Sequence, residues 1–296
     1  DARRAGAGWE IRTRLPAIGS RLFVLPKKAL RMKVLPRRTE KTVAVRTIKP
    51  KAWSVQLSEP NVLVLDMPRY KIADGPWQKA AEILAVDQAV RKSLGIPLRG
   101  GHMAQPWTRP APEQPRSTTV ALRYTFHVDA LPSGSLQLAL ERPETFEVRL
   151  NGGAPVDTNT ASGWWVDASL RTLNLDPADL RLGENTLDLV CRYDETHSGL
   201  EMIYLLGTFG VAVKGLRSTM VAAPASLRLG DWTRQGLPFY SGSVCYTTKL
   251  AAKPAKGCRL VIQVGEFRGT AVRVLVDGRE AGLVAWPPYE LDITDA

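Results

Sequence analysis

The sequence predicts an all-β protein with two β-sandwiches in tandem and one short helix between β segments. Apolar and polar residues alternate over most of the chain, which is the period of a strand with one buried face. One segment alone, near residues 79–94, carries apolar residues at helical spacing. The strands and turns of residues 120–155 recur in the same order in residues 242–281, which indicates a duplicated structural unit.

The composition is that of an ordinary globular protein, with 44% hydrophobic and 23% charged residues among 296. No apolar run reaches the roughly 18 residues that span a bilayer, and the N-terminus lacks the apolar core of a signal peptide. We therefore expect no membrane partner. Because an initiator methionine is also missing, we expect the sequence to be a piece of a larger polypeptide.

The cysteine spacing argues against a metal centre. Cys191, Cys245 and Cys258 are odd in number and far apart, so we expect neither a zinc site nor a disulfide framework. Cys245 and Cys258 could face each other across adjacent strands, and the sequence leaves that pairing open.

The positive charge is concentrated at the start of the chain. Residues 1–51 hold 15 Lys and Arg against three acids, a net charge of 15 − 3 = +12, so residues 52–296 sum to 11 − 12 = −1. Such an arm can bind nucleic acid, but here the charges are spread through apolar alternation. We interpret them as solvated strand faces, or as a face that packs on an acidic neighbour, and expect no nucleic-acid partner.

The segment before residue 118 combines short strands with the helix. Ala80, Ile83 and Val90 belong to its apolar stripe, and Gly95 is a suitable C-cap. Residues 96–117 are rich in Pro and Gly and predict a loop or linker. The strands predicted in this segment are residues 21–25, 30–35, 42–48, 53–57 and 61–72.

From residue 118 onward every predicted element is a strand. Gly183-Glu184-Asn185 lies between two apolar runs and predicts a turn in which Gly and Asn adopt positive φ. We assign residues 56–215 to the first sandwich and 216–296 to the second. The strands predicted up to the first boundary are residues 118–131, 135–142, 145–153, 163–175, 185–193 and 201–213.

The two copies share a sequence of landmarks. "VALRYTFHV" at 120–128 matches "GSVCYTTKL" at 242–250, and each copy continues with an acid, an internal Arg and an Asn-Gly or Asp-Gly turn. These turns are 277 − 151 = 126 residues apart. The landmark pairs are Glu141 with Glu266, Arg149 with Arg273, and Asn151-Gly152 with Asp277-Gly278.

The duplication also pairs two Trp-containing loops. "GWWVD" corresponds to "AWPPY", so both loops are predicted to enter a strand at the same position of the sandwich. Repetition favours a structural role, because a fold needs the feature in each copy and a binding site needs it once. We therefore expect Trp286 and Pro287 to cover the end of the second sandwich, with Tyr289 as the solvent-side contact.

These stretches resemble the galactose-binding-like jelly rolls of large bacterial glycoside hydrolases. They are most similar to the family 2-type sugar-binding modules of α-L-rhamnosidase-like proteins. The resemblance covers about residues 55–296, and it implies that residues 1–55 are the terminal strands of a preceding β domain. In that family the "WPPY" segment precedes one or two further strands, whereas the second copy here lacks a second "GEN"-type turn, so we expect it to be incomplete. The motifs that carry the resemblance are "GLPFYSGSVCYTTKL", "VGEFRGTAVRVLVDGREAGLVAWPPYELDIT", "VRLNGG", "GWWVD", "LGENTLDL" and "GLEMIYLLGTFGV".

The resemblance implies an accessory, non-catalytic region that positions the catalytic domain of the same parent chain and binds a glycan weakly. It also implies a periplasmic or extracellular bacterial location. It implies no cofactor apart from an optional structural calcium ion.

Eight residues are candidate carbohydrate contacts. Trp164 and Trp165 precede Asp167, and because adjacent strand residues point to opposite faces, only one of the two rings can enter the core. The other ring would stack on a sugar or contact a neighbouring domain, and Asp167 would accept sugar hydroxyls. Glu201 is expected to face water or to pair with an arginine. The remaining candidates are Glu266, Arg268, Trp286 and Tyr289.

No catalytic residue is predicted within this segment. The resemblance places the catalytic carboxylates on a separate barrel, and the glutamates present here alternate along strands as surface charges do. Neither a G-x-S-x-G elbow nor a P-loop occurs, and His102, His127 and His197 are isolated. Two alternatives remain open: an interdomain scaffold with no ligand, and a glycosidase with its own site between the two sandwiches.

Overall fold

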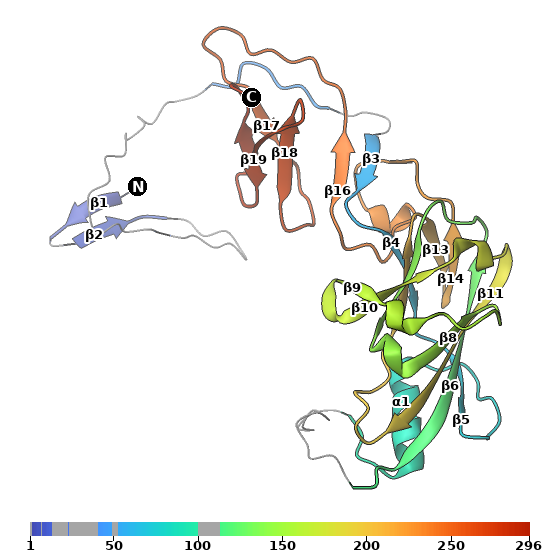
Figure 1. The fold of residues 1–296 in the computed structure, drawn as a ribbon. Coiled ribbons are helices and arrows are strands. Elements are labelled where there is room, and N and C mark those ends of the chain that lie inside the picture. The colour runs from blue at the N-terminus through green and yellow to red at the C-terminus, as the bar shows by residue number, and fades with distance from the viewer. Residues whose placement is uncertain (1, 7, 14–22, 24–40, 49–52, 100–112) are drawn as a thin grey trace. The chain divides into compact units, whose positions relative to one another are not determined.

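The computed structural model describes residues 2–6, 8–13, 23, 41–48, 53–99 and 113–296 (Figure 1). The chain divides into two compact units, Asp1–Ile48 and Lys49–Ala296. Strands dominate the described residues, and they contain one α-helix, which confirms the predicted all-β class.

The first unit contains a hairpin that was not predicted from the sequence. Strands β1 (Ala2–Ala5) and β2 (Gly8–Ile11) pair antiparallel, and Arg3 Nε donates to Glu10 Oε2 at 2.9 Å. The strand predicted at residues 42–48 is wrong: residues 41–48 carry no regular structure. Val43 and Val45 are 79% and 80% exposed, so the apolar alternation there finds no surface to cover. The strands predicted at residues 21–25 and 30–35 fall on residues outside the described part, except for Phe23.

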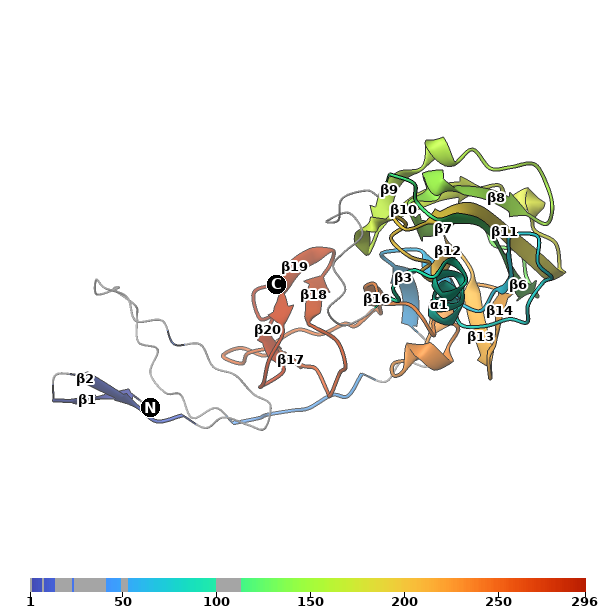
Figure 2. The same ribbon diagram turned by 90° about the horizontal axis from the view of Figure 1, so that it is seen from below.

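The second unit is built around a sandwich of two sheets (Figures 1 and 2). The first sheet has the order β4-β12-β7-β10-β9, and the second has the order β13-β14-β6-β11-β8, with β5 also paired to β6. The strands of the first sheet are β4 (Asn61–Leu65), β7 (Leu136–Glu141), β9 (Ser162–Trp165), β10 (Asp167–Leu175) and β12 (Ile203–Gly207). Those of the second are β5 (Arg69–Ile72), β6 (Ser117–Val128), β8 (Phe146–Leu150), β11 (Gly183–Asp194), β13 (Gly210–Lys214) and β14 (Arg217–Val221).

The core lies between these two sheets. Alternate residues of β6 and β11 are buried, as the period of two requires of strands with one face inward. Leu138 and Leu205 from one sheet and Tyr124 and Leu189 from the other belong to the same buried cluster. The alternation predicted at residues 118–131 and 185–193 is thereby confirmed. The strands predicted at 163–175 and 201–213 are each divided in two, into β9 and β10 with Val166 at a φ of 61° between them, and into β12 and β13.

The helix α1 (Ile83–Leu94) packs against β6 and adds Val86 and Val90 to this core. It begins four residues later than predicted, because the side chain of Glu82 caps it by accepting from the backbone nitrogens of residues 84 and 85. It ends at Gly95, whose φ of 63° is the left-handed C-cap conformation that the sequence predicted.

The internal repeat is visible in the strand pairing. In the second copy β17 (Val261–Gln263) pairs antiparallel with β20 (Glu290–Asp292), as β7 pairs with β10 in the first. The hairpin of β18 (Val272–Val276) and β19 (Arg279–Val284) turns at Asp277-Gly278, with φ of 48° and 79°. Asn151-Gly152 turns in the same way, with φ of 51° and 69°.

The offset of 126 residues maps one pairing onto the other. Val148 bridges Val156 in the first copy, and Val274 pairs with Gly282 in the second. By this register Arg273 stands at the place of Glu147, so the correspondence of Arg149 with Arg273 that the sequence suggested is wrong by two residues. The register is fixed by the Asn151-Gly152 and Asp277-Gly278 turns, and the match of the two Arg residues did not take the distance to these turns into account.

Strand pairing crosses both boundaries drawn from the sequence. β14, beyond residue 215, pairs parallel with β6 through Thr219 and His127. Strand β3 (Trp53–Leu57) spans residue 55 and pairs with β16 (Val244–Thr247) of the second copy and with β15 (Ser226–Leu227). The three-stranded sheet β15-β3-β16 therefore joins segments from either end of the second unit.

The turn predicted at residues 183–185 is displaced toward residue 182, because all three predicted residues lie within β11, which begins at Gly183. Gly183 has the expected positive φ, 90°, but the φ of Asn185 is not positive. Its side chain acts instead: Asn185 Oδ1 accepts from the Arg181 backbone nitrogen at 3.0 Å, and Nδ2 donates to the Arg181 carbonyl at 2.7 Å. The buried side chain of Asn185, at the start of β11, therefore holds the backbone of the preceding turn at Arg181.

The three cysteines, Cys191, Cys245 and Cys258, are free thiols. The pairing of Cys245 with Cys258 that the sequence left open is not formed.

Candidate functional site

Two aromatic rings lie side by side on the five-stranded sheet of the first sandwich. Trp165 ends β9 and Tyr204 lies on β12, and their ring centroids are 4.9 Å apart at an angle of 54°. Both rings pack over Ala139, which is buried beneath them and is the register partner of Tyr204. Because Leu138 and Leu140 on the same strand point into the core, Ala139 and the two rings belong to the opposite, outer face.

A row of acids borders these rings. Glu141 ends β7 opposite Leu170, and Ser169 Oγ donates to Glu141 Oε1 at 3.5 Å. Ser169 also donates from its backbone nitrogen and its hydroxyl to Asp167 Oδ1, each at 2.8 Å. These hydrogen bonds, the backbone one first, lower the pKa of Asp167 below its usual value. Asp167 is therefore held ionised beside Glu141.

Glu201 completes the row and is ion-paired with Arg99, as one of its two predicted alternatives required. Arg99 Nη1 also donates to the Leu200 carbonyl at 3.2 Å. This packing needs glycine at position 199: its φ is 119°, and a Cβ there would overlap the Arg99 guanidinium.

The electrostatics show that the acids and the rings share one environment. Burial raises the pKa of Glu141, and the negative charge of Glu201 raises it further. Burial also raises the pKa of Tyr204, and the charges of Glu201 and Glu141 contribute. The sequence-predicted residues Trp165, Asp167 and Glu201 are thus brought into one neighbourhood, together with Glu141 and Tyr204, which were not predicted as contacts.

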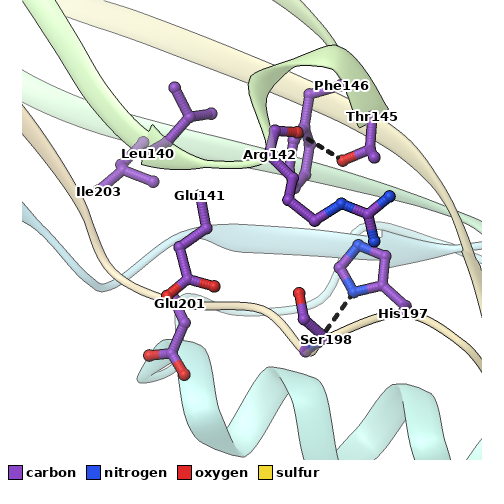
Figure 3. A pocket seen from close by; sticks show the side chains of 10 residues that line it. Leu140, Glu141, Arg142, Thr145, Phe146, His197, Ser198, Glu201 and Ile203 are labelled. Carbon is purple, nitrogen blue, oxygen red and sulfur yellow. Dashed lines mark hydrogen bonds between the residues drawn. The ribbon is translucent and has the colours of Figure 1, made fainter. Parts of the chain in front are cut away.

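A solvent-open pocket lies next to the two glutamates (Figure 3). Its cavity volume is about 20 Å³, which is room for about one water molecule and far below the roughly 300–1,000 Å³ of ligand pockets. In Figure 3 the Arg142 side chain extends toward His197. Burial first, and the positive charge of Arg142 second, lower the pKa of His197 to about 4, so its ring is neutral near pH 7. The pocket is lined by Leu140, Glu141, Arg142, Thr145, Phe146, His197, Ser198, Gly199, Glu201 and Ile203.

A buried ion pair on α1 holds the loop that carries His197 and Glu201. Arg91 Nε donates to Asp87 Oδ2 at 2.9 Å, and their side chains are 3% and 2% exposed. Asp87 Oδ1 accepts from the Tyr193 hydroxyl at 2.7 Å and from the Leu200 backbone nitrogen at 2.9 Å. The His197 ring stacks on Tyr193, with centroids 4.5 Å apart. This network was not predicted from the sequence, where its signal was an acid and a base four residues apart on the apolar stripe of the helix.

The other predicted contacts lie elsewhere. Trp164, adjacent to Trp165, is 62% exposed, while Trp165 is half-buried on the outer face of the sheet, so neither ring enters the core between the two sheets, as one was expected to. Glu266, Arg268, Trp286 and Tyr289 belong to the second copy. Within the described residues Glu266 and Arg268 form no ion pair with each other.

The expectation that Trp286 and Pro287 cover the end of the second sandwich is wrong. Trp286 is 75% exposed and Pro287 is exposed too, whereas Tyr289 is half-buried. The Tyr289 ring packs edge-on against Phe267, with centroids 5.1 Å apart, and its carbonyl accepts from the Val264 backbone nitrogen at 2.8 Å. These contacts draw Tyr289 inward and leave Trp286 projecting outward.

No protein-family model matches the chain, and no curated protein matches it. In the part of the chain that the structure describes, no three or more His, Cys, Asp or Glu residues are grouped as a metal site would require. The one α-helix there, α1, is too short to cross a membrane.

Proposed function

We propose that this chain is an accessory, non-catalytic β-sandwich region of a glycoside hydrolase, which helps to position the catalytic domain and binds glycan weakly. The observation that carries the proposal is the pair of rings, Trp165 and Tyr204, bordered by Glu141 and Glu201 on one sheet face. An aromatic ring offers an apolar surface to the C–H groups of a sugar. Carboxylates accept from its hydroxyls, and Arg99 can donate to its ring or hydroxyl oxygens.

The size of the site suggests a low affinity. One stacked ring contributes about 0.5–1.5 kcal/mol beyond its buried area, by analogy with aromatic pairs. Two or three hydroxyl contacts on an open face add little after the entropy of association is lost, which leaves a dissociation constant in the millimolar range. Weak binding of this kind suits an accessory region that acts together with a catalytic domain.

A glycosidase is the second candidate, and one observation favours it. The raised pKa of Glu141 beside a second carboxylate, Glu201, is the arrangement that lets one acid donate a proton while another stays ionised. Against it, Glu201 is ion-paired with Arg99, and the pocket, with a cavity volume of about 20 Å³, is too small to enclose a sugar ring. Hydrolysis of aryl glycosides by the purified chain, lost in Glu141→Gln, would favour this candidate over binding alone.

The binding proposal is tested by titrating the full chain with a panel of oligosaccharides at about 10 mM, near the expected dissociation constant, and recording amide chemical shifts. Trp165→Ala should abolish the response, and Trp164→Ala is the matched control, since it removes the same ring from the adjacent, exposed position. Because Trp165→Ala also uncovers Ala139, Glu141→Gln provides a second variant that leaves the rings in place. If no glycan shifts any resonance, or if the two Trp variants behave alike, the region is a scaffold.

A further inference from the structure

The second copy presents two strand edges that are filled in the first copy. In the first copy β11 lies between β6 and β8, and it pairs with β6 along its whole length and with β8 from Leu187 to Cys191. The repeat places β16 at the position of β6 and β18 at the position of β8. Among the described residues β16 pairs with β3 alone and β18 with β19 alone, so each has one edge without a partner strand.

The unpaired edges are the ones that β11 occupies in the first copy. β6 pairs with β5 on its other edge, and Leu122 faces Tyr70 there, as Val244 of β16 faces Leu57 of β3. β8 bridges Val156 on its other edge, as β18 pairs with β19. In the first copy the remaining edge of β6 and the remaining edge of β8 both pair with β11. The unpaired edges of β16 and β18 correspond to these two edges.

Within the described residues, the positions that β11 covers in the first copy are less buried in the second. Tyr124 and Val148 are fully buried in the first copy, at 1% and 0% exposed, whereas their counterparts Tyr246 and Val274 are half-buried. The inward row of β18 as a whole, Val272, Val274 and Val276, is half-buried. An unpaired strand edge beside an open apolar row is a template for another strand.

We propose that the edges of β16 and β18 receive an extended polypeptide segment with the residue pattern of β11, supplied as an additional strand. Its apolar residues would alternate as Leu187, Leu189 and Cys191 do. Its outward residues would be acidic at the places of Glu184 and Asp188. Two basic residues of the second copy favour this charge: Lys249 stands where His127 faces Glu184, and Arg273, which also pairs with Glu280 at 3.7 Å, lies diagonal to the place of Asp188. This inference does not depend on carbohydrate binding.

The register of the first copy supplies a sharp test. Asp188 of β11 faces Arg123 of β6, and the repeat places the exposed Cys245 at the position of Arg123. Directly opposed strand residues lie within the distance that a disulfide requires. A peptide of residues 182–194 that carries Asp188→Cys and Cys191→Ser should therefore link to Cys245 of the full chain in a glutathione buffer. Cys258→Ser in the chain removes the other accessible thiol.

The register is checked by moving the thiol along both strands. Thr186 faces Thr125, whose counterpart is Thr247. A chain with Cys245→Ser and Thr247→Cys should lose the adduct with the first peptide. It should gain one with a peptide that carries Thr186→Cys and Cys191→Ser.

Two variants of β18 distinguish binding of the peptide between β16 and β18 from nonspecific reaction of the Cys245 thiol. Val274→Asp, in the inward row, should remove the adduct, and Leu275→Asp, at the neighbouring outward position that is 51% exposed, should keep it. An equal yield with a scrambled peptide, or adducts that ignore the register, would overturn the proposal. Dimers of the chain linked through these edges without any peptide would also overturn it, since a second copy would then be the occupant.

Discussion

Removing the carboxylate of Asp87 should destabilise the first sandwich far more than removing a carboxylate from its surface. In Asp87→Ala the guanidinium of Arg91 is left 3% exposed without its counter-charge. Breaking a buried ion pair at one partner costs about 3–5 kcal/mol. The Tyr193 hydroxyl and the Leu200 backbone nitrogen also lose their acceptor, at about 1–3 kcal/mol each if they find no other. These costs overlap, because water can enter the vacated site, and we expect a loss of about 4 kcal/mol.

The assay is urea unfolding of the purified chain, followed by thermal melting. A loss of about 4 kcal/mol lowers the melting temperature by about 8–16 °C for a domain of this size. Glu147→Ala is the matched control, because Glu147 pairs with Arg149 on the surface at 2.6 Å with both side chains well exposed, and such pairs contribute about 0–1 kcal/mol. If Asp87→Ala costs no more than Glu147→Ala, the network does not hold α1 and the 197–201 loop.

Stability should also respond to changes at His197, at Asn185 and in the second copy. His197 binds its proton less tightly in the fold, with a pKa lowered to about 4, than in the unfolded chain, so the free energy of unfolding should fall by about 2 kcal/mol between pH 7 and pH 5. His197→Asn should flatten this part of the pH profile in urea titrations; an unchanged profile would contradict the burial of a neutral ring. Asn185→Ala should cost about 1–3 kcal/mol by calorimetry, since it removes the buried Asn185 amide that accepts from the Arg181 backbone nitrogen, whereas Asn159→Ala, on an exposed turn, should cost less than about 0.5 kcal/mol. A fragment of residues 222–296 should give a poorly dispersed amide spectrum, because its strands β16 and β18 have open edges and a half-buried core; good dispersion would show that this copy closes by itself.

The sequence predicted those parts of the fold where one residue pattern has one physical solution. The alternation in residues 117–128 and 183–194 must place one row of side chains inward, and an apolar stripe that ends at Gly95 must be a helix with a left-handed cap. The duplication could be recognised because it repeats both a turn and the strand that follows. The same alternation misled at residues 42–48, since a strand also needs a neighbour to pair with.

The candidate site was predictable only in part, because sequence specifies which residues alternate but not which strands become neighbours. Trp165 and Asp167 are close in the sequence and were predicted together. Tyr204 joins them because β12 and β10 flank β7 in the sheet, a long-range pairing that no local pattern encodes. The exposure of Trp286 was missed for a related reason: the packing of Tyr289 on Phe267 determines which ring turns inward.

The indole N–H resonances of the two adjacent tryptophans can decide whether the ring pair binds glycan. Trp165 packs beside Tyr204 at the proposed glycan surface, while Trp164 is exposed away from that ring pair. On titration of the full chain with galactose- or rhamnose-containing oligosaccharides, we expect the Trp165 indole signal to shift in a saturable way and the Trp164 signal to stay in place. A stationary Trp165 signal throughout the titration, or a shift of Trp164 alone, would contradict carbohydrate binding at this face.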